Sequence, residues 1–142
     1  SMIYSSLAQC YSEIGDYQNC LTVLQKDLEI YEDELDESEG KEKNINQSVR
    51  EKLASIYNNL GNTYKLMKDY NLSIESYQKA LKVLSSLEEI DVKNVSSIYV
   101  NLSVIYLEMK DFKSALEALE ESMILKKRKY NEVSKEFAEY YT

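Results

Sequence analysis

The sequence predicts an all-α fold, a solenoid in which antiparallel helix pairs stack into a superhelix. The first observation behind this is repetition: NLGNTYKLMKDY at 59–70 recurs in altered form as SLAQCYSEIGDY at 6–17 and NLSVIYLEMKDF at 101–112. The second is that apolar residues within each copy recur at intervals of three and four, as on one helical face. Repeats of this length are single supersecondary units that bury their apolar faces only by stacking on neighbours.

The three repeats align when each is numbered so that its first aromatic residue is position 4, which places Tyr4, Tyr57 and Tyr99 together. Positions 4, 7, 8 and 11 then share one face of a first helix, because a helix turns by about 100° per residue. A turn and a second helix follow, with an aromatic residue at position 17 and packed residues at positions 20, 24 and 27. From position 7 onward these residues are Leu7, Ala8, Tyr11, Tyr17, Cys20, Leu24 and Asp27, then Leu60, Gly61, Tyr64, Tyr70, Ser73, Tyr77 and Ala80, then Leu102, Ser103, Tyr106, Phe112, Ala115, Leu119 and Ser122.

The repeat spacings are 53 and 42 residues, so the second helices are expected to be long. The abrupt ending AEYYT leads us to expect a fragment of a longer array, and Tyr141 falls at position 4 of a further repeat. A helix that runs on unbroken past Asn131 is the alternative, and it would favour a homodimer through the exposed terminal repeat. We therefore expect one domain with repeats at about 1–35, 46–88 and 92–130 and the start of a fourth at 131–142, helices at 2–14, 17–35, 48–67, 71–87, 92–109 and 113–129, and a charged loop at 36–45 around Gly40.

Composition argues against an enzyme. The chain has no His, so it lacks the commonest general base and transition-metal ligand, and its three glycines are too scattered for a phosphate-binding loop. We therefore expect no catalytic residue, no metal and no cofactor. The two cysteines, Cys10 and Cys20, are expected to be reduced and packed as small apolar residues.

Charge and hydropathy restrict the partners and the location. A net charge of −8 disfavours nucleic acid and anionic membrane surfaces, which bind cationic patches. No apolar run is long enough to span a membrane and no signal peptide is evident, so we expect a cytoplasmic protein, with the nucleus as the alternative. Nine of the 25 acidic residues lie between Asp27 and Glu42. This run is interpreted as a solvated helix end and loop, and the basic run KKRK at 126–129 as a complement to a helix dipole, with docking patches as the alternative for both.

The order of aromatic, Leu, small residue and Tyr, then small, bulky and small residues, resembles the tetratricopeptide repeat, most clearly in YNNLGNTYKLMKDYNLSIESYQKAL at 57–81. The period of about 42 residues resembles the lengthened repeats of kinesin light chains and of Pins-type adaptors. Three departures stand out. The helix-ending Pro is absent, and Lys68 and Lys110 replace a Gly that would adopt the left-handed conformation without strain. Asp27 stands where a small residue packs, so that helix is expected to be rotated or its carboxylate exposed.

The resemblance implies a non-catalytic scaffold for protein–protein interaction, which binds a peptide segment of a partner in a concave groove lined by the first helices. Side-chain amides there can pair with the backbone of an extended peptide, a role that the resemblance assigns to Asn59 and Asn101. A carboxylate clamp is excluded, because positions 2 and 5 of these helices carry no Lys or Arg. The alternatives are a solvated polar face, a sensor of short signalling peptides, or a structural spacer or self-association segment of a longer solenoid. The candidate groove residues are Gln9, Asn58, Asn59, Asn62, Asn101 and Val104.

Overall fold

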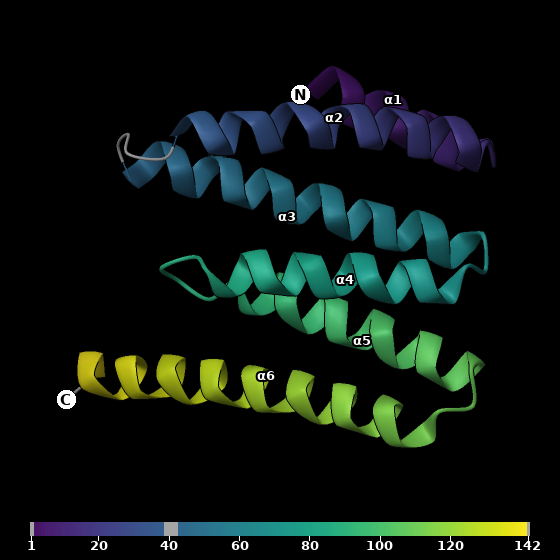
Figure 1. The fold of residues 1–142 in the computed structure, drawn as a ribbon. Helices are drawn as coiled ribbons and strands as arrows, with labels where there is room; N and C mark the ends of the chain where they lie inside the picture. Colours follow the sequence, from purple (N-terminus) through teal and green to yellow (C-terminus); the bar gives the residue numbers. More distant parts are fainter. Residues whose placement is uncertain (1, 39–42, 142) are drawn as a thin grey trace. The chain divides into compact units, whose positions relative to one another are not determined.

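A computed structural model describes residues 2–38 and 43–141, with the side chains of 43 and 44 excepted. Within these residues every regular element is a helix, so the predicted all-α fold class is confirmed (Figure 1). The chain divides into two compact units, Ser1–Glu89 and Ile90–Thr142, and each is described here by itself. Unit 1 contains α1 (Met2–Glu13), α2 (Tyr17–Ser38), α3 (Lys43–Leu66) and α4 (Tyr70–Ser85), and unit 2 contains α5 (Val92–Glu108) and α6 (Phe112–Tyr141).

The predicted charged loop at 36–45 is shorter than expected. Residues 36–38 still belong to α2 and 43–45 already belong to α3, whereas its centre around Gly40 lies outside the described residues. Local hydrogen bonds explain the longer helices: the Asn46 amide donates to Ser38 Oγ at 3.1 Å, and Arg50 Nε donates to Asn46 Oδ1 at 2.6 Å. These bonds satisfy polar groups at the facing helix ends, and Val49 is buried one turn further along α3.

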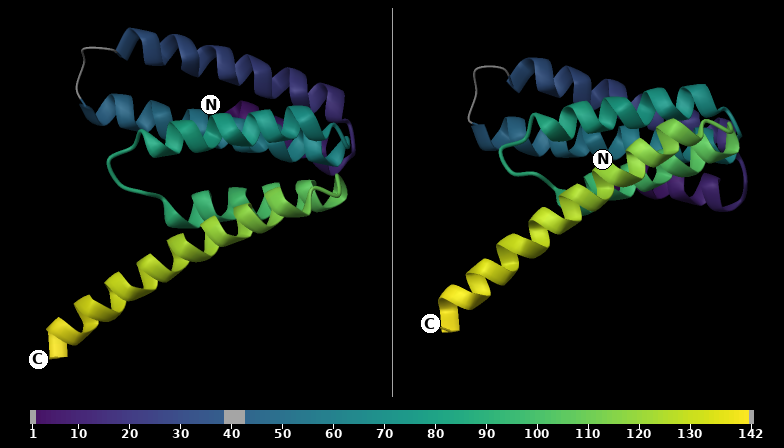
Figure 2. Two further views of the ribbon diagram at one scale, coloured as in Figure 1. Left: turned by 60° about the horizontal axis from the view of Figure 1, so that its bottom comes forward. Right: turned by 90° about the horizontal axis from the view of Figure 1, so that it is seen from below.

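The expected helix end near Lys129 is wrong, because α6 continues to Tyr141 without a break (Figure 2). The chain contains no Pro and has no Gly after Gly61, so nothing at Asn131 stops the helix. From Tyr130 to Tyr141 every side chain is exposed, since this part of α6 extends past its partner α5. That 131–142 opens a fourth repeat stays a prediction.

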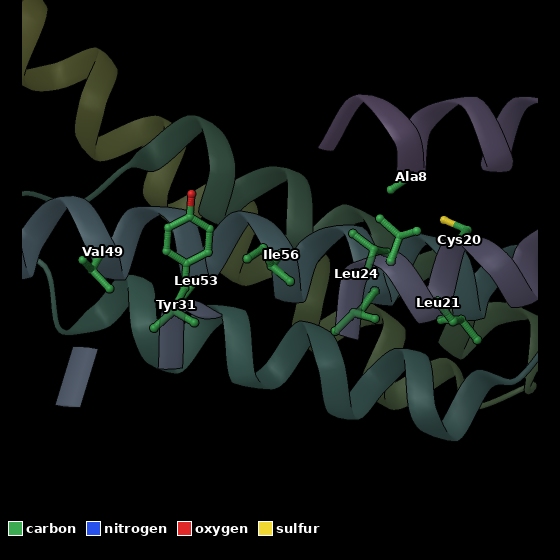
Figure 3. Close-up of a cluster of buried hydrophobic side chains, with 10 residues drawn as sticks. Ala8, Cys20, Leu21, Leu24, Tyr31, Val49, Leu53 and Ile56 are labelled. Atoms are coloured by element: carbon green, nitrogen blue, oxygen red, sulfur yellow. The ribbon is translucent and has the colours of Figure 1, made fainter. Parts of the chain in front are cut away.

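One cluster in the core of unit 1 is formed by side chains of α1, α2 and α3 (Figure 3), and Tyr77, Ala80 and Leu84 of α4 are buried as well. Tyrosines at positions 4 and 11 of the first two repeats, namely Tyr4, Tyr11, Tyr57 and Tyr64, are half-buried against it, which confirms their assignment to the packed face. Each fully buried Leu, Val or Ile contributes about 1.5–3 kcal/mol to stability. The fully buried members are Ala8, Cys20, Leu21, Val23, Leu24, Tyr31, Val49, Leu53, Ile56 and Leu60.

Small residues at positions 8 and 20 bring the two helices of a repeat together. A Cβ atom at Gly61 would lie 2.7 Å from the Tyr77 ring, and the Ser73 hydroxyl donates to the Gly61 carbonyl at 2.7 Å. The equivalent residues Ala8, Ser103, Cys20 and Ala115 are also buried. Position 24 differs between the units, since Leu24 and Tyr77 are buried whereas Leu119 in unit 2 is 38% exposed.

The turn between the helices of each repeat is built in the same way three times. Gly15, Lys68 and Lys110 have positive φ, at 78°, 62° and 61°, so the expected left-handed lysines are confirmed. An aspartate follows each of them, and its carboxylate accepts a backbone hydrogen bond from the next helix, a cap that sequence reasoning missed. The pairs are Asn19 N to Asp16 at 3.3 Å, Leu72 N to Asp69 at 3.4 Å and Ser114 N to Asp111 at 3.2 Å.

Asp27 corrects the expectation for the first repeat, because its side chain is only 1% exposed. Its neighbours at positions 20 and 24, Cys20 and Leu24, are also buried, so α2 keeps the register of the other second helices. A carboxylate therefore occupies the buried site that Ala80 fills in the next repeat.

The two cysteines differ from the expectation in one respect. Cys20 is buried, with its Sγ atom 3.5 Å from Thr63 Oγ1, whereas Cys10 is exposed. Leu7 and Phe112, both expected on packed faces, are exposed as well. Each lies on a helix at the end of its unit's helix series, where fewer neighbours cover it.

Candidate functional site

A cleft of about 320 Å³ opens between α1 and α3 in unit 1, with α2 as its floor. We call it the α1–α3 cleft. Ala8 and Cys20, both small and buried, lie at the bottom of the cleft. The lining residues are Met2, Ser5, Ser6, Ala8, Gln9, Ser12 and Glu13 of α1, Cys20 and Leu24 of α2, and Asn59, Asn62 and Thr63 of α3.

A second cavity of about 160 Å³ continues from the cleft, since Met2, Ser5 and Asn59 line both. We call it the Asp27 cavity. Lys52 Nζ lies 5.2 Å from the centre of the Tyr31 ring, a cation–π distance. The residues that line only this second cavity are Asp27, Tyr31, Lys52, Ser55 and Ile56.

Three of the predicted groove amides meet in the α1–α3 cleft. Gln9 is exposed on the α1 wall, and Asn59 is half-buried where the two cavities join. The Oδ1 atom of Asn62 already accepts a hydrogen bond from the Tyr77 hydroxyl. Burial raises the pKa of Tyr77 above its ordinary value, so the hydroxyl keeps its proton. The amide nitrogen of Asn62 is consequently the group that can still donate to a ligand.

The other candidate residues do not line this cleft. Asn58 points elsewhere on α3, and its Oδ1 atom is buried without a hydrogen-bond partner among the described residues. Asn101 and Val104 belong to α5 in unit 2, where Asn101 is half-buried and Val104 exposed.

The sequence pattern located the walls of the cleft but missed its floor. Met2, Ser6, Gln9 and Glu13 all line it, and their spacing of three and four residues places them on one face of α1. The buried lining residues of α2 were not expected there, because only first helices were considered. They are Cys20 and Leu24 in the cleft and Asp27 and Tyr31 in the Asp27 cavity. Their signal was present, since positions 20, 24, 27 and 31 share one face of a second helix.

Chemically, the two cavities offer neutral hydrogen-bonding groups and few charges. Among the described residues, Glu13 is the one charged residue that lines the α1–α3 cleft, and Asp27 and Lys52 line the second cavity. Across the described residues, no cluster of three or more His, Cys, Asp or Glu side chains is arranged to hold a metal ion. None of the helices in residues 2–38 and 43–141 is both long and apolar enough to cross a membrane.

Helix pairs joined by aspartate-capped turns, with small residues at the pair contacts and a polar cleft between first helices, define a helical repeat protein of the α-solenoid class. Two tetratricopeptide-repeat family models match the sequence, one over residues 52–127 and the other over 3–38. The chain therefore belongs to the tetratricopeptide repeat family. Domains of this family generally mediate protein–protein interactions and are typically non-catalytic scaffolds.

The fold is similar to that of BtubC (BKLC) from P. vanneervenii, whose crystal structure superimposes with a TM-score of 0.73 at 21% sequence identity. The match covers 91% of this chain and 47% of that one, so this chain spans about half the length of BtubC. No curated protein matches the sequence. The likeness to the lengthened repeats of kinesin light chains and Pins-type adaptors stays a prediction.

Proposed function

We propose that the protein captures an extended peptide segment of a partner protein in the α1–α3 cleft. The observation that carries the proposal is the convergence of Gln9, Asn59 and Asn62 on one open cleft of about 320 Å³. Gln9 and Asn59 each offer a donor and an acceptor and Asn62 offers its amide N–H, so together they can pair with the N–H and C=O groups of an extended backbone whatever its side chains are.

The size and charge of the cleft support this class of ligand. Its volume is at the lower end of the ~300–1,000 Å³ range of ligand pockets, which suits a few residues of a peptide rather than a folded domain. Because Glu13 is the one charged residue that the described part of the chain contributes to the lining, affinity is expected to depend only moderately on salt. On α5, Asn101 and Val104 occupy positions 6 and 9 of the third repeat, and we propose that they contact a peptide on unit 2.

The test begins by selecting peptides from a random library on the wild-type protein and measuring their affinity by isothermal titration. Gln9→Ala combined with Asn59→Ala is expected to weaken binding by about tenfold or more, since two or three hydrogen bonds are lost. Circular dichroism and urea unfolding should change little, because neither amide belongs to the core. Asn101→Ala, measured separately, tests the proposed peptide contact of unit 2.

Gln78→Ala is the matched control. Gln78 is an exposed amide on α4 that lines neither cavity, so its removal should leave the affinity unchanged. An equal loss of affinity in the control and the cleft variant would contradict the proposed cleft and favour the spacer role. Selected peptides whose affinity changes in neither variant would do the same.

A further inference from the structure

The exposed face of α6 carries an apolar stripe with heptad spacing, which the core of unit 2 does not use. The helix buries Ala115, Ala118 and Ser122, whereas the stripe beside them stays exposed, including Tyr130 at 72%, Phe137 at 63% and Tyr140 at 83%. Intervals of three and four alternate along its whole length, as in the a and d positions of a coiled coil. The stripe consists of Leu116, Leu119, Met123, Lys126, Tyr130, Val133, Phe137 and Tyr140.

We propose that this stripe pairs α6 with α6 of a second copy of the chain, in antiparallel orientation, to form a homodimer. A spacing of 3.5 residues keeps the stripe on one side of both helices as they wind around each other. The side chains of the last twelve residues of α6 are all exposed, and a large exposed apolar patch of this kind marks an interaction site.

The charges beside the stripe select both the partner and its direction. The basic run at 126–129 lies on one side of Asn131, and Glu132, Glu136 and Glu139, with Lys135 among them, lie on the other, so an inverted copy sets segments of opposite net charge against each other. With Tyr130 packed on Val133 of the other copy, Lys129 faces Glu136 of that copy, and the two-fold axis repeats the pair. A parallel copy would instead align the two basic runs and repel.

The same register also accommodates the polar residue within the stripe. Lys126 of one copy lies beside Phe137 of the other, where an ammonium group can rest on the aromatic ring. Phe137 is already held by Tyr141, with ring centroids 4.7 Å apart, so the aromatic surface is pre-formed. The proposed dimer uses neither unit 1 nor its cleft, so its test is independent of the test of peptide capture.

The test is sedimentation velocity of the wild-type chain across a dilution series, with charge variants at the proposed contact. Lys129→Glu alone or Glu136→Lys alone should weaken the dimer by about tenfold, since each creates two like-charge contacts per dimer. Both changes in one chain should restore the wild-type dissociation constant, because the pair is re-formed with reversed signs. Phe137→Ser should abolish dimers, and circular dichroism should show that each variant keeps its helices.

Lys93→Glu, the same charge reversal at an exposed residue of α5, is the matched control and should leave dimerisation unchanged. A wild-type chain that stays monomeric at every concentration overturns the proposal. A dimer that survives Phe137→Ser, or one that the double reversal does not restore, overturns the antiparallel α6 pairing and assigns the stripe to another occupant, such as a neighbouring repeat or a different protein.

Discussion

Gly61 and Tyr77 fix how closely α3 and α4 approach. The Tyr77 ring is fully buried and lies where a side chain at position 61 would project. Its hydroxyl reaches past the contact to Asn62, so the same residue packs a repeat and orients an amide of the α1–α3 cleft. The contact thereby links core packing to the proposed binding surface.

Gly61→Ala should lower the free energy of unfolding by about 1–3 kcal/mol, because the added Cβ would lie 2.7 Å from the Tyr77 ring. Helix propensity alone would make Ala more stabilising than Gly by ~1 kcal/mol, so the measured change shows whether the steric overlap outweighs the propensity. Urea unfolding of a double-mutant cycle checks it. In the Tyr77→Leu background the same substitution should become neutral or stabilising, and an equal loss in both backgrounds would contradict the proposed contact.

Tyr57 makes stability depend on alkaline pH. Burial, together with a 2.9 Å hydrogen bond from its hydroxyl to the Glu32 carboxylate, raises the pKa of Tyr57 from 10.0 to about 12. The folded state keeps the proton while the unfolded state loses it, so this contribution to stability is fully present below about pH 10 and is lost as pH rises toward 12.

Wild-type protein should therefore lose stability between about pH 8 and about pH 11 more steeply than Tyr57→Phe, which has no proton to release. Urea unfolding at the two pH values measures the difference. Glu32→Gln removes the carboxylate and should give an intermediate slope. An identical alkaline loss in Tyr57→Phe and wild type would show that this hydroxyl is not coupled to folding.

Residue roles were predictable where a repeated position fixed them. Ala8, Gly61 and Ser103 were assigned to close contacts by spacing alone, and all three are buried. The burial of Asp27 was not predicted, because the sequence shows an acidic residue at a packed position without showing the cavity that it lines. The bond from Tyr77 to Asn62 was equally hidden, since helical register does not determine which hydroxyl reaches which amide.

At the scale of the element, helix starts were easier to predict than helix ends. Aspartates precede α4 and α5 and cap them, and α6 begins directly after Asp111, so these starts lie within a residue of expectation. The predicted end of α6 at Lys129 was twelve residues too early. Local helix propensity does not distinguish Lys129 from Tyr141 as the end of the helix.

Amide hydrogen exchange should divide α6 into two parts. At low protein concentration residues 131–141 should exchange far faster than residues 112–122, because only the latter pack on α5. Mass spectrometry of exchange against time provides the measurement. Protection of 131–141 that rises with concentration would support the α6 dimer, whereas uniform protection along α6 in a dilute monomer would contradict this division.

At the scale of the whole molecule, the sequence predicts the family and fold class because both depend on a pattern that recurs three times. Within each unit the helix contacts join sequence neighbours, α1 with α2, α2 with α3, α3 with α4, and α5 with α6. Stability in such an array is approximately a sum of repeat and neighbour contributions. The candidate site was harder to predict, since the cleft depends on two repeats together and no single repeat contains it.

The three capped turns have a consequence for how such a chain can change. Each turn is closed by a left-handed residue and an aspartate whose carboxylate accepts a hydrogen bond from the next helix, so these closing bonds lie within one repeat. A helix pair whose turn is closed by bonds within the repeat can be exchanged for another such pair. Gene duplication can add or remove such a pair without remodelling the turn, which leaves natural selection free to act on the surfaces that differ between copies.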